Sequence, residues 1–202
     1  MRSSQFCDYI PHRLLIFAGE SHLSFIDEIR EPDIKELFLF WLEKRGGRTI
    51  PLRKDIGPTG IKPRHLPYLF IYRREAGGRF RCILIGTEIV KVFHRDETGM
   101  YLDEIVPAHS RSSRLKLFSR CVDDARPVYY SGPALIHTRE RRRVSRILLP
   151  VSSDGGAADH IFGMSLFGPV LDKLPMGTAF PENEEPAVIA IASDEDLDTA
   201  SG

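Results

Sequence analysis

The first strong pattern in the chain is a run of apolar residues at helical spacing between Asp33 and Arg45. The residues that would share one face of this helix are Ile34, Leu37, Phe38, Trp41 and Leu42. Asp33 and Glu36 have the spacing of a capping box, and Gly46-Gly47 follows the basic last turn. The sequence therefore predicts a helix over residues 33–45.

Short runs rich in β-branched, aromatic and aliphatic residues indicate strands further along the chain. Residues 69–73 and 80–85 flank Ala76-Gly77-Gly78, which predicts a hairpin. Helical spacing returns over residues 113–124, and three more strand patterns follow over residues 128–138, 144–152 and 159–167. This order predicts an α+β fold, with a five-stranded antiparallel sheet, helices on one face and an N-terminal helical extension.

The segment after the hairpin carries two turn signals. Gly86-Thr87 ends the second strand, and the missing Cβ of Gly86 predicts a sharp backbone turn there. Thr98-Gly99 predicts a second tight turn, with Asp96 placed to accept a hydrogen bond from the backbone just downstream. A strand that passes into short helices beside an apolar wall indicates a small sensory domain rather than a catalytic cleft.

Composition sets the broad class of the protein. The chain has 202 residues, of which 42% are hydrophobic and 28% charged, and its formal net charge is zero. These values are typical of one globular domain with extensions, and they give no argument for bulk attraction to nucleic acid or membrane. The three cysteines are far apart and form no Cys-x-x-Cys pair, so we expect a reducing, cytoplasmic setting and no metal site.

Local composition divides the chain into three parts. Residues 1–31 show no clean period and are interpreted as an N-terminal arm, and residues 32–170 contain the predicted elements. Residues 171–202 are rich in acidic residues, Pro, Ala, Ser and Thr, so we expect a flexible acidic tail. No apolar run approaches the roughly 20 residues that a membrane-spanning helix needs, so no membrane partner is expected.

Several separated motifs within this order of elements carry a family resemblance. They are Trp41, Pro51-x-Arg53-x-Asp55, Pro58, Leu66-Pro67, Gly86-Thr87, Asp96-x-Thr98-Gly99, Arg126-Pro127 and Leu149-Pro150. Their order and spacing, over about residues 35–168, resemble the alphaproteobacterial PAS_5 family of small proteins built around one PAS domain. The resemblance implies a sensory or regulatory role and no fixed ligand, since PAS domains bind diverse molecules or none.

One position departs from the family pattern. Members of the family carry an arginine inside the second strand, where this sequence has Ile83. Arg81 lies two positions earlier and would project from the same face of the strand, because strand side chains alternate with a period of two. Whether Arg81 takes the place of that arginine is open at this point.

The PAS architecture implies a core that can hold a small apolar ligand between the sheet and the long helix. The candidate wall residues are Ile85, Phe118, Cys121, Tyr130 and Met164. The alternative is that these side chains simply fill a core of ordinary packing density. Tyr130 is the best discriminator, because a buried phenol needs a hydrogen-bond partner.

The sequence carries no pattern that identifies a cofactor or a reaction. No Gly-x-Ser-x-Gly, His-x-x-x-His or phosphate-loop pattern occurs, so we expect no enzymatic activity. His109 precedes the long helix and could ligate haem, but a loop histidine is the simpler interpretation. Cys82 and Cys121 lack the polar motif of a photoactive flavin site and are expected to be buried. The cofactor, if there is one, stays unknown.

Two surfaces are candidates for partners. The segment Arg139–Arg146 could bind the phosphates of nucleic acid or of a nucleotide, but it falls at a predicted connection between strands, where charge is normally solvated. The apolar face of the 33–45 helix can pack on its own sheet or against a second copy, with Phe38 and Trp41 as anchors of a homodimer.

These observations favour a cytoplasmic sensory or regulatory module that acts through ligand- or partner-dependent protein–protein interaction, with an unidentified signalling protein as its partner. Two alternatives remain. One is an interaction adaptor that binds no ligand, and the other is a nucleic-acid-binding or nucleotide-binding module that uses Arg139–Arg146.

Overall fold

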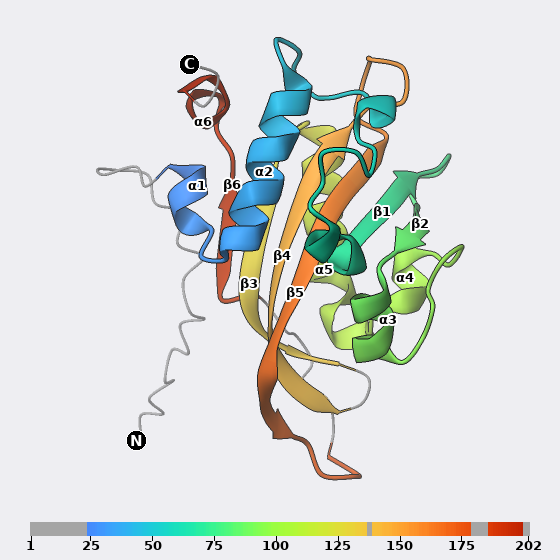
Figure 1. The fold of residues 1–202 in the computed structure, drawn as a ribbon. Coiled ribbons are helices and arrows are strands. Elements are labelled where there is room, and N and C mark those ends of the chain that lie inside the picture. The colour runs from blue at the N-terminus through green and yellow to red at the C-terminus, as the bar shows by residue number, and fades with distance from the viewer. Residues whose placement is uncertain (1–23, 137–138, 179–185, 200–202) are drawn as a thin grey trace, which may run out of the picture.

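An antiparallel sheet of six strands runs through the computed structural model, which describes residues 24–136, 139–178 and 186–199 (Figure 1). The order of strands across the sheet is β2-β1-β5-β4-β3-β6. The predicted α+β class and antiparallel pairing are confirmed. The strands are β1 (Leu69–Arg74), β2 (Phe80–Ile85), β3 (Val128–Leu135), β4 (Glu140–Val151), β5 (His160–Lys173) and β6 (Val188–Ile191).

Helices lie on both sides of this sheet. The N-terminal extension α2 crosses one face in front of β3, β4 and β5, whereas α5 lies behind the sheet (Figure 1). The short helices α3 and α4 accompany α5, as predicted for the main body of the domain. The helices are α1 (Phe25–Glu28), α2 (Pro32–Arg45), the 3-10 turns η1 (Arg53–Asp55) and η2 (Pro63–Tyr68), α3 (Thr87–Phe93), α4 (Leu102–Ile105), α5 (Ala108–Asp123) and α6 (Asp194–Thr199).

The prediction of five strands was one short, because the sixth strand lies within the segment predicted to be a flexible tail. The apolar residues Val188–Ile191 form β6, which pairs with β3 at the edge of the sheet. The backbone N–H of Ala192 then donates to the carbonyl of Pro127, and Arg126 forms an ion pair with Asp194 at 2.7 Å. The acidic composition around this segment concealed its three β-branched residues, Val188, Ile189 and Ile191. Residues 179–185 and 200–202 of the predicted tail lie outside the described residues.

The predicted N-terminal arm also contains ordered elements. Phe25 and Ile29 are buried in the core, and the backbone N–H of Phe25 donates to Asp196 Oδ1 of α6 at 2.7 Å. The described part of the arm therefore packs against the C-terminal end of the chain. Residues 1–23 of the predicted arm lie outside the described residues.

The start of α2 differs from the prediction. Pro32 is its first residue, Glu31 occupies the N-cap position, and the predicted capping box of Asp33 and Glu36 is wrong. Glu31 instead accepts hydrogen bonds from two strand side chains, Ser145 Oγ at 2.6 Å and Tyr129 OH at 2.8 Å. Its carboxylate therefore fastens the beginning of α2 to the sheet. The C-terminus is as predicted, with Gly46 at φ 56° and its N–H bonded to the carbonyl of Leu42.

The contacts of β4 assign the two faces of the sheet. Ser145 binds Glu31 and therefore projects towards α2, so its neighbour Arg146 projects towards α5. Directly paired residues share a face, and this places Ser165, which pairs with Arg146, on the α5 side. Met164, which pairs with Ile147, lies on the α2 side.

The two predicted turns have different physical origins. Gly99 adopts φ 85°, and Asp96 Oδ1 accepts the backbone N–H of Thr98 at 2.9 Å, as expected. Gly86 instead has an ordinary extended backbone, with φ −73° and ψ 151°. A Cβ at Gly86 would lie 2.2 Å from the carbonyl oxygen of Pro67. Close approach to η2, rather than a sharp turn, therefore requires glycine at this position.

We predict that Gly86→Ala destabilises the fold by about 1–3 kcal/mol, because the added methyl meets backbone that can move only with η2. Urea unfolding measures the change. Gly47→Ala is the matched control, since a Cβ there has no neighbour within 4 Å. Equal free energies of unfolding for the two variants would contradict the packing explanation.

Candidate ligand cavity

A cavity of about 70 Å³ lies between the sheet and helices α3 to α5. A single water needs roughly 10–15 Å³ by the same measure, so the cavity has room for several waters or a small molecule. Most of the wall is apolar, with a few polar groups. The lining residues are Phe70, Tyr72, Ile85, Ile89, Phe93, Glu97, Leu102, Ile105, Val106, Pro107, Ser110, Arg114, Ala134, Leu135, Ile136, Val144, Arg146 and Ser165.

Arg146 supplies a positive charge on the sheet side of the cavity. Its Nε donates to Ser165 Oγ at 2.6 Å, and its Nη1 donates to Tyr130 OH at 3.3 Å. Its guanidinium lies 5.4 Å from the ring centroid of Phe70. Burial disfavours the charged form, but the neighbouring Tyr130 and other groups outweigh it and raise the pKa of Arg146, so the side chain stays charged.

Arg114 brings a second guanidinium to the cavity from α5. Its Cζ lies 4.6 Å from the ring centroid of Tyr130, in cation–π contact. Its Nη1 is buried and has no hydrogen-bond partner among the residues that the structure describes. The Cζ of Arg146 lies 6.0 Å from the same ring, so a helix arginine and a strand arginine share one aromatic side chain.

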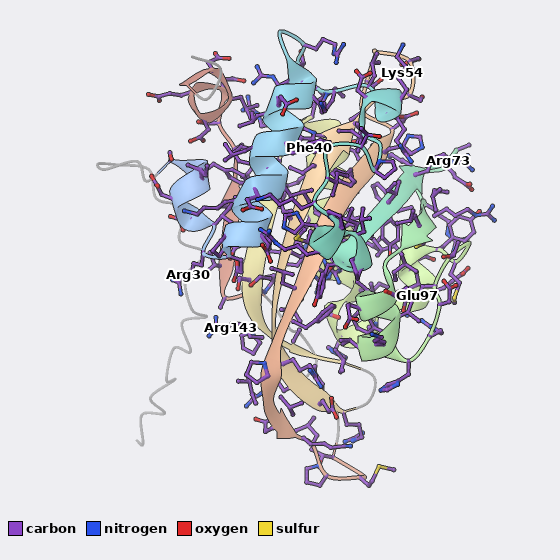
Figure 2. The ribbon with its side chains drawn as sticks, viewed as in Figure 1. Arg30, Phe40, Lys54, Arg73, Glu97 and Arg143 are labelled. Atoms are coloured by element: carbon purple, nitrogen blue, oxygen red, sulfur yellow. The ribbon has the colours of Figure 1, made fainter. Side chains whose placement is uncertain are left out.

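Glu97 is the acidic group of the cavity. It follows Asp96 in the tight turn before α4, lies beside α3 in Figure 2, and is only 3% exposed. Its Oε1 lies 3.2 Å from Arg95 Nη2. Burial outweighs this ion pair and raises the pKa of the Glu97 carboxyl above its ordinary value.

A family model for the PAS domain, PAS_5, matches residues 29–166 and therefore covers the sheet up to β5 together with α2 to α5. The chain belongs to the PAS domain family. This confirms the resemblance found in the sequence. None of the curated proteins compared with this chain matches it. Within the described residues, no helix has the length and apolar character that crossing a membrane requires.

Of the five predicted wall residues, Ile85 lines the cavity and Tyr130 contacts two arginines that line it. Tyr130 is buried beneath the two arginines, and its hydroxyl accepts a hydrogen bond from Arg146. The partner that this phenol needs is therefore a protein group on the cavity wall.

The other three predicted wall residues lie elsewhere in the core. Phe118 is fully buried, with its ring 5.2 Å from that of Tyr72 and 5.5 Å from that of Phe80. Cys121 is also fully buried and does not line the cavity. Met164 projects from the opposite face of the sheet, towards α2.

The basic segment Arg139–Arg146 is not a uniform surface patch. It was predicted to be a connection, but β4 begins at Glu140, so most of the segment is strand. Arg141 pairs with Asp172, and Arg142 pairs with Glu140 at 3.1 Å. Arg146 turns inward, whereas the exposed Arg143 lies on the other side of the sheet from Glu97 (Figure 2).

Sequence reasoning missed the polar groups of the cavity. The signal for Arg146 was present, because it is the one cation within the apolar run from Val144 to Val151. Its period-two spacing from Val144 and Leu148 gives it a core-facing position. Arg114 and Glu97 carry no comparable signal, since charged residues in a helix or a turn are normally solvated.

The residues considered for cofactors do not line the cavity. His109 is half-buried near the start of α5, and Cys82 is fully buried, which raises the pKa of its thiol to about 12. Arg81 lies outside the cavity, with its Nε 3.6 Å from Glu75 and its guanidinium 5.0 Å from the Tyr101 ring. A cavity of about 70 Å³ is also far below the roughly 300–1,000 Å³ of pockets for drug-sized ligands, so haem or flavin does not fit it as it stands.

Phe38 and Trp41 pack within their own chain. Both are buried, and the ring of Phe38 lies 4.9 Å from that of Phe25 and 6.3 Å from that of Trp41. Trp41 Nε1 donates to the carbonyl of Pro150 at 2.9 Å. The apolar face of α2 therefore packs on the sheet of its own chain.

Asp33, Glu36 and His65 form a cluster outside the cavity whose potential ligand atoms lie within 4.8 Å of one another. Arg64 Nη2 lies 3.1 Å from the Asp33 carboxylate and 2.7 Å from that of Glu36, and Lys62 Nζ lies 2.9 Å from Glu36. These side-chain cations already balance the two carboxylates. The cluster is best explained as a link between α2 and η2.

We predict that Glu97 makes the stability of the protein depend on pH in a way that Glu97→Gln removes. The pKa of Glu97 is raised in the folded state, so folding favours its protonated form. The free energy of unfolding of the wild type, relative to Glu97→Gln, should therefore fall as the pH rises from the ordinary value of 4.5 to the folded value. Above that value the difference should be constant.

Urea titrations of both proteins across this range, extended to pH values below the ordinary Asp pKa of 3.8 for the control, test the prediction. Asp103→Asn is a control of opposite sign, because Arg79 lowers the pKa of the Asp103 carboxyl. Parallel profiles for the wild type and Glu97→Gln would contradict the assignment.

Proposed function

We propose that this PAS domain is a cytoplasmic sensory or regulatory module in which a small molecule occupies the cavity and changes the binding of a signalling protein. The observation that supports it best is the pair of arginines at a cavity inside an otherwise packed core. Interiors normally approach the packing density of organic crystals. A partly buried charge at a cavity costs stability, and a ligand can compensate for it.

The cavity wall suggests how occupancy reaches the surface. Ile89 on α3, Leu102 on α4 and Arg114 on α5 all line it, opposite Phe70 and Arg146 on the sheet. A ligand that contacts both the helices and the sheet stabilises the conformation in which the helices lie close to the sheet. Differential contact of this kind is what a ligand needs in order to shift the populations of two conformers. The partner would bind the outer surface of these helices.

The role that we propose is regulatory and involves no chemical step. PAS domains are generally sensory. In this cavity Arg146 is oriented by hydrogen bonds to Ser165 and Tyr130, and Glu97 by a hydrogen bond from Arg95, which suits them to binding a ligand. Dimerisation remains a prediction, and it would need a surface other than Phe38 and Trp41, which are buried within one chain.

An adaptor that binds no ligand is the second candidate. The edge strand β2 exposes Ile83 and Leu84, with 38% and 43% of their surface accessible. An edge strand with exposed apolar side chains can pair with a strand of another protein. Nucleic-acid binding has less support, because Arg141 and Arg142 are paired with Asp172 and Glu140 and Arg146 faces the cavity.

We predict that freshly purified protein retains a small molecule and that filling the cavity removes it. Ala134 lines the cavity, and Ala134→Leu adds three carbon atoms there. Native and denaturing mass spectrometry should show an added mass on the folded wild type that disappears on unfolding. The added mass should be absent from Ala134→Leu, and it should persist in Ala157→Leu, the same substitution at an exposed turn.

Hydrogen exchange on the same samples tests the regulatory part. Exchange in α5 should be slower in the ligand-bound wild type than in Ala134→Leu. A bare chain mass for the wild type, with the same α5 exchange in all three proteins, would reject the sensor and favour the adaptor.

A further inference from the structure

We infer that the ligand of this cavity is a small aliphatic monocarboxylate whose carboxylate binds between Arg114 and Arg146, an inference that rests on the proposed ligand-binding function. Glu97, which lines the cavity, is labelled beside α3 in Figure 2. Three properties of the cavity support this ligand: its donors, its charge and its size.

The two arginines have hydrogen-bond donors to spare. Arg146 makes two donor contacts, through Nε and Nη1, and a guanidinium has five N–H groups. Arg114 Nη1 is buried with no partner in the part of the chain that the structure describes. Both arginines line the same cavity, and their guanidinium groups lie 4.6 and 6.0 Å from the centroid of the Tyr130 ring. A planar carboxylate matches the donors of a guanidinium in pairs.

The balance of charge points to an anion. Arg114 and Arg146 bring two positive charges to the wall, and Glu97 is the one acid among the described lining residues. Glu97 also lies 3.2 Å from Arg95, so it is shared with a third cation. The cavity therefore has a surplus of positive charge even when Glu97 is ionised. An anion offsets that surplus, and the apolar part of the wall favours a carboxylate with an aliphatic tail over inorganic phosphate.

The remainder of the wall selects an aliphatic tail. Phe70, Ile85, Ile89, Leu102 and Val106 present apolar surface and offer no side-chain donor. The volume of about 70 Å³ is roughly five times what one water needs, which fits a ligand of only a few heavy atoms. Butyrate has such a shape, with a three-carbon tail and one carboxylate, and it serves as the probe.

Any retained molecule is first removed by unfolding and refolding the protein. Calorimetric titration of this ligand-free protein with butyrate, with its uncharged analogue butyramide and with inorganic phosphate tests the inference. Butyrate should bind the wild type. Butyramide should bind at least about tenfold more weakly, because a charged hydrogen bond contributes a factor of this order. Phosphate should also bind at least about tenfold more weakly, because it has no apolar tail to bury. Arg114→Gln should weaken butyrate binding by a similar factor. Arg120→Gln, an exposed position on the same helix, should leave the affinity unchanged.

A second pair of variants covers the strand arginine. Arg146→Gln should abolish the preference for butyrate over butyramide, while Arg143→Gln, exposed on the same strand, should preserve it. Circular dichroism melting checks that each variant is folded, and the Arg114 pair decides the question if Arg146→Gln unfolds. Ala134→Leu should lose butyrate binding because the cavity is filled.

The outcomes separate this inference from the proposed function. Equal affinity for butyrate and butyramide, stronger binding of phosphate, no butyrate binding to the wild type, or unchanged binding by Arg114→Gln would each overturn the monocarboxylate. A neutral molecule retained by the wild type and lost from Ala134→Leu would overturn it too, while leaving the proposed sensor standing. A carboxylic acid identified in the denatured extract would support both.

Discussion

The alternation of side chains along β4 connects the two halves of this structure. Ser145 projects to one side and fastens Glu31 at the beginning of α2, while Arg146 projects to the other side and faces the cavity. A slip of one residue in register would exchange the two, placing a guanidinium under α2 and a hydroxyl at the cavity. The long antiparallel pairing of β4 with β5 holds this register. The outer helix and the cavity therefore depend on the same strand.

A charged group at that position is costly, and the surrounding residues show how the cost is limited. Arg146 donates to Ser165 and Tyr130 and contacts the ring of Phe70, so part of its hydration is replaced by protein groups. The carboxylate that could balance it, Glu97, is buried and engaged with Arg95. An apolar side chain of similar volume would be the simpler choice for stability alone. Retention of the guanidinium is therefore more readily explained by recognition than by folding.

The fold could be predicted from the sequence because its determinants are local. Apolar spacing located α2 and the strands, and the Gly77-Gly78 turn adopts the positive φ values that glycine permits. Residues whose role depends on distant partners were not predictable. Position 86 must be glycine because the backbone of Pro67 lies too close for a Cβ. The Glu31 side chain makes no capping hydrogen bond and instead accepts one from Tyr129. Strand β6 forms by pairing with the edge of β3. The same limit applies to the cavity, where Ile85 followed from the strand pattern but Arg114 and Glu97 are brought in by tertiary packing.

The division of the two arginines between a helix and the sheet would give a ligand of the cavity, as proposed above, a means of regulation. Arg146 is fixed by hydrogen bonds to its own sheet, whereas Arg114 reaches the cavity from α5 and is held mainly by its contact with the Tyr130 ring. An anion bound by both would attach α5 to the sheet, and in its absence the two positive charges repel one another. A bound anion would therefore stabilise the conformation in which α5 lies close to the sheet, relative to one in which it has moved away. A difference of about 1.4 kcal/mol between the two states changes their ratio tenfold, which a single charged hydrogen bond can supply.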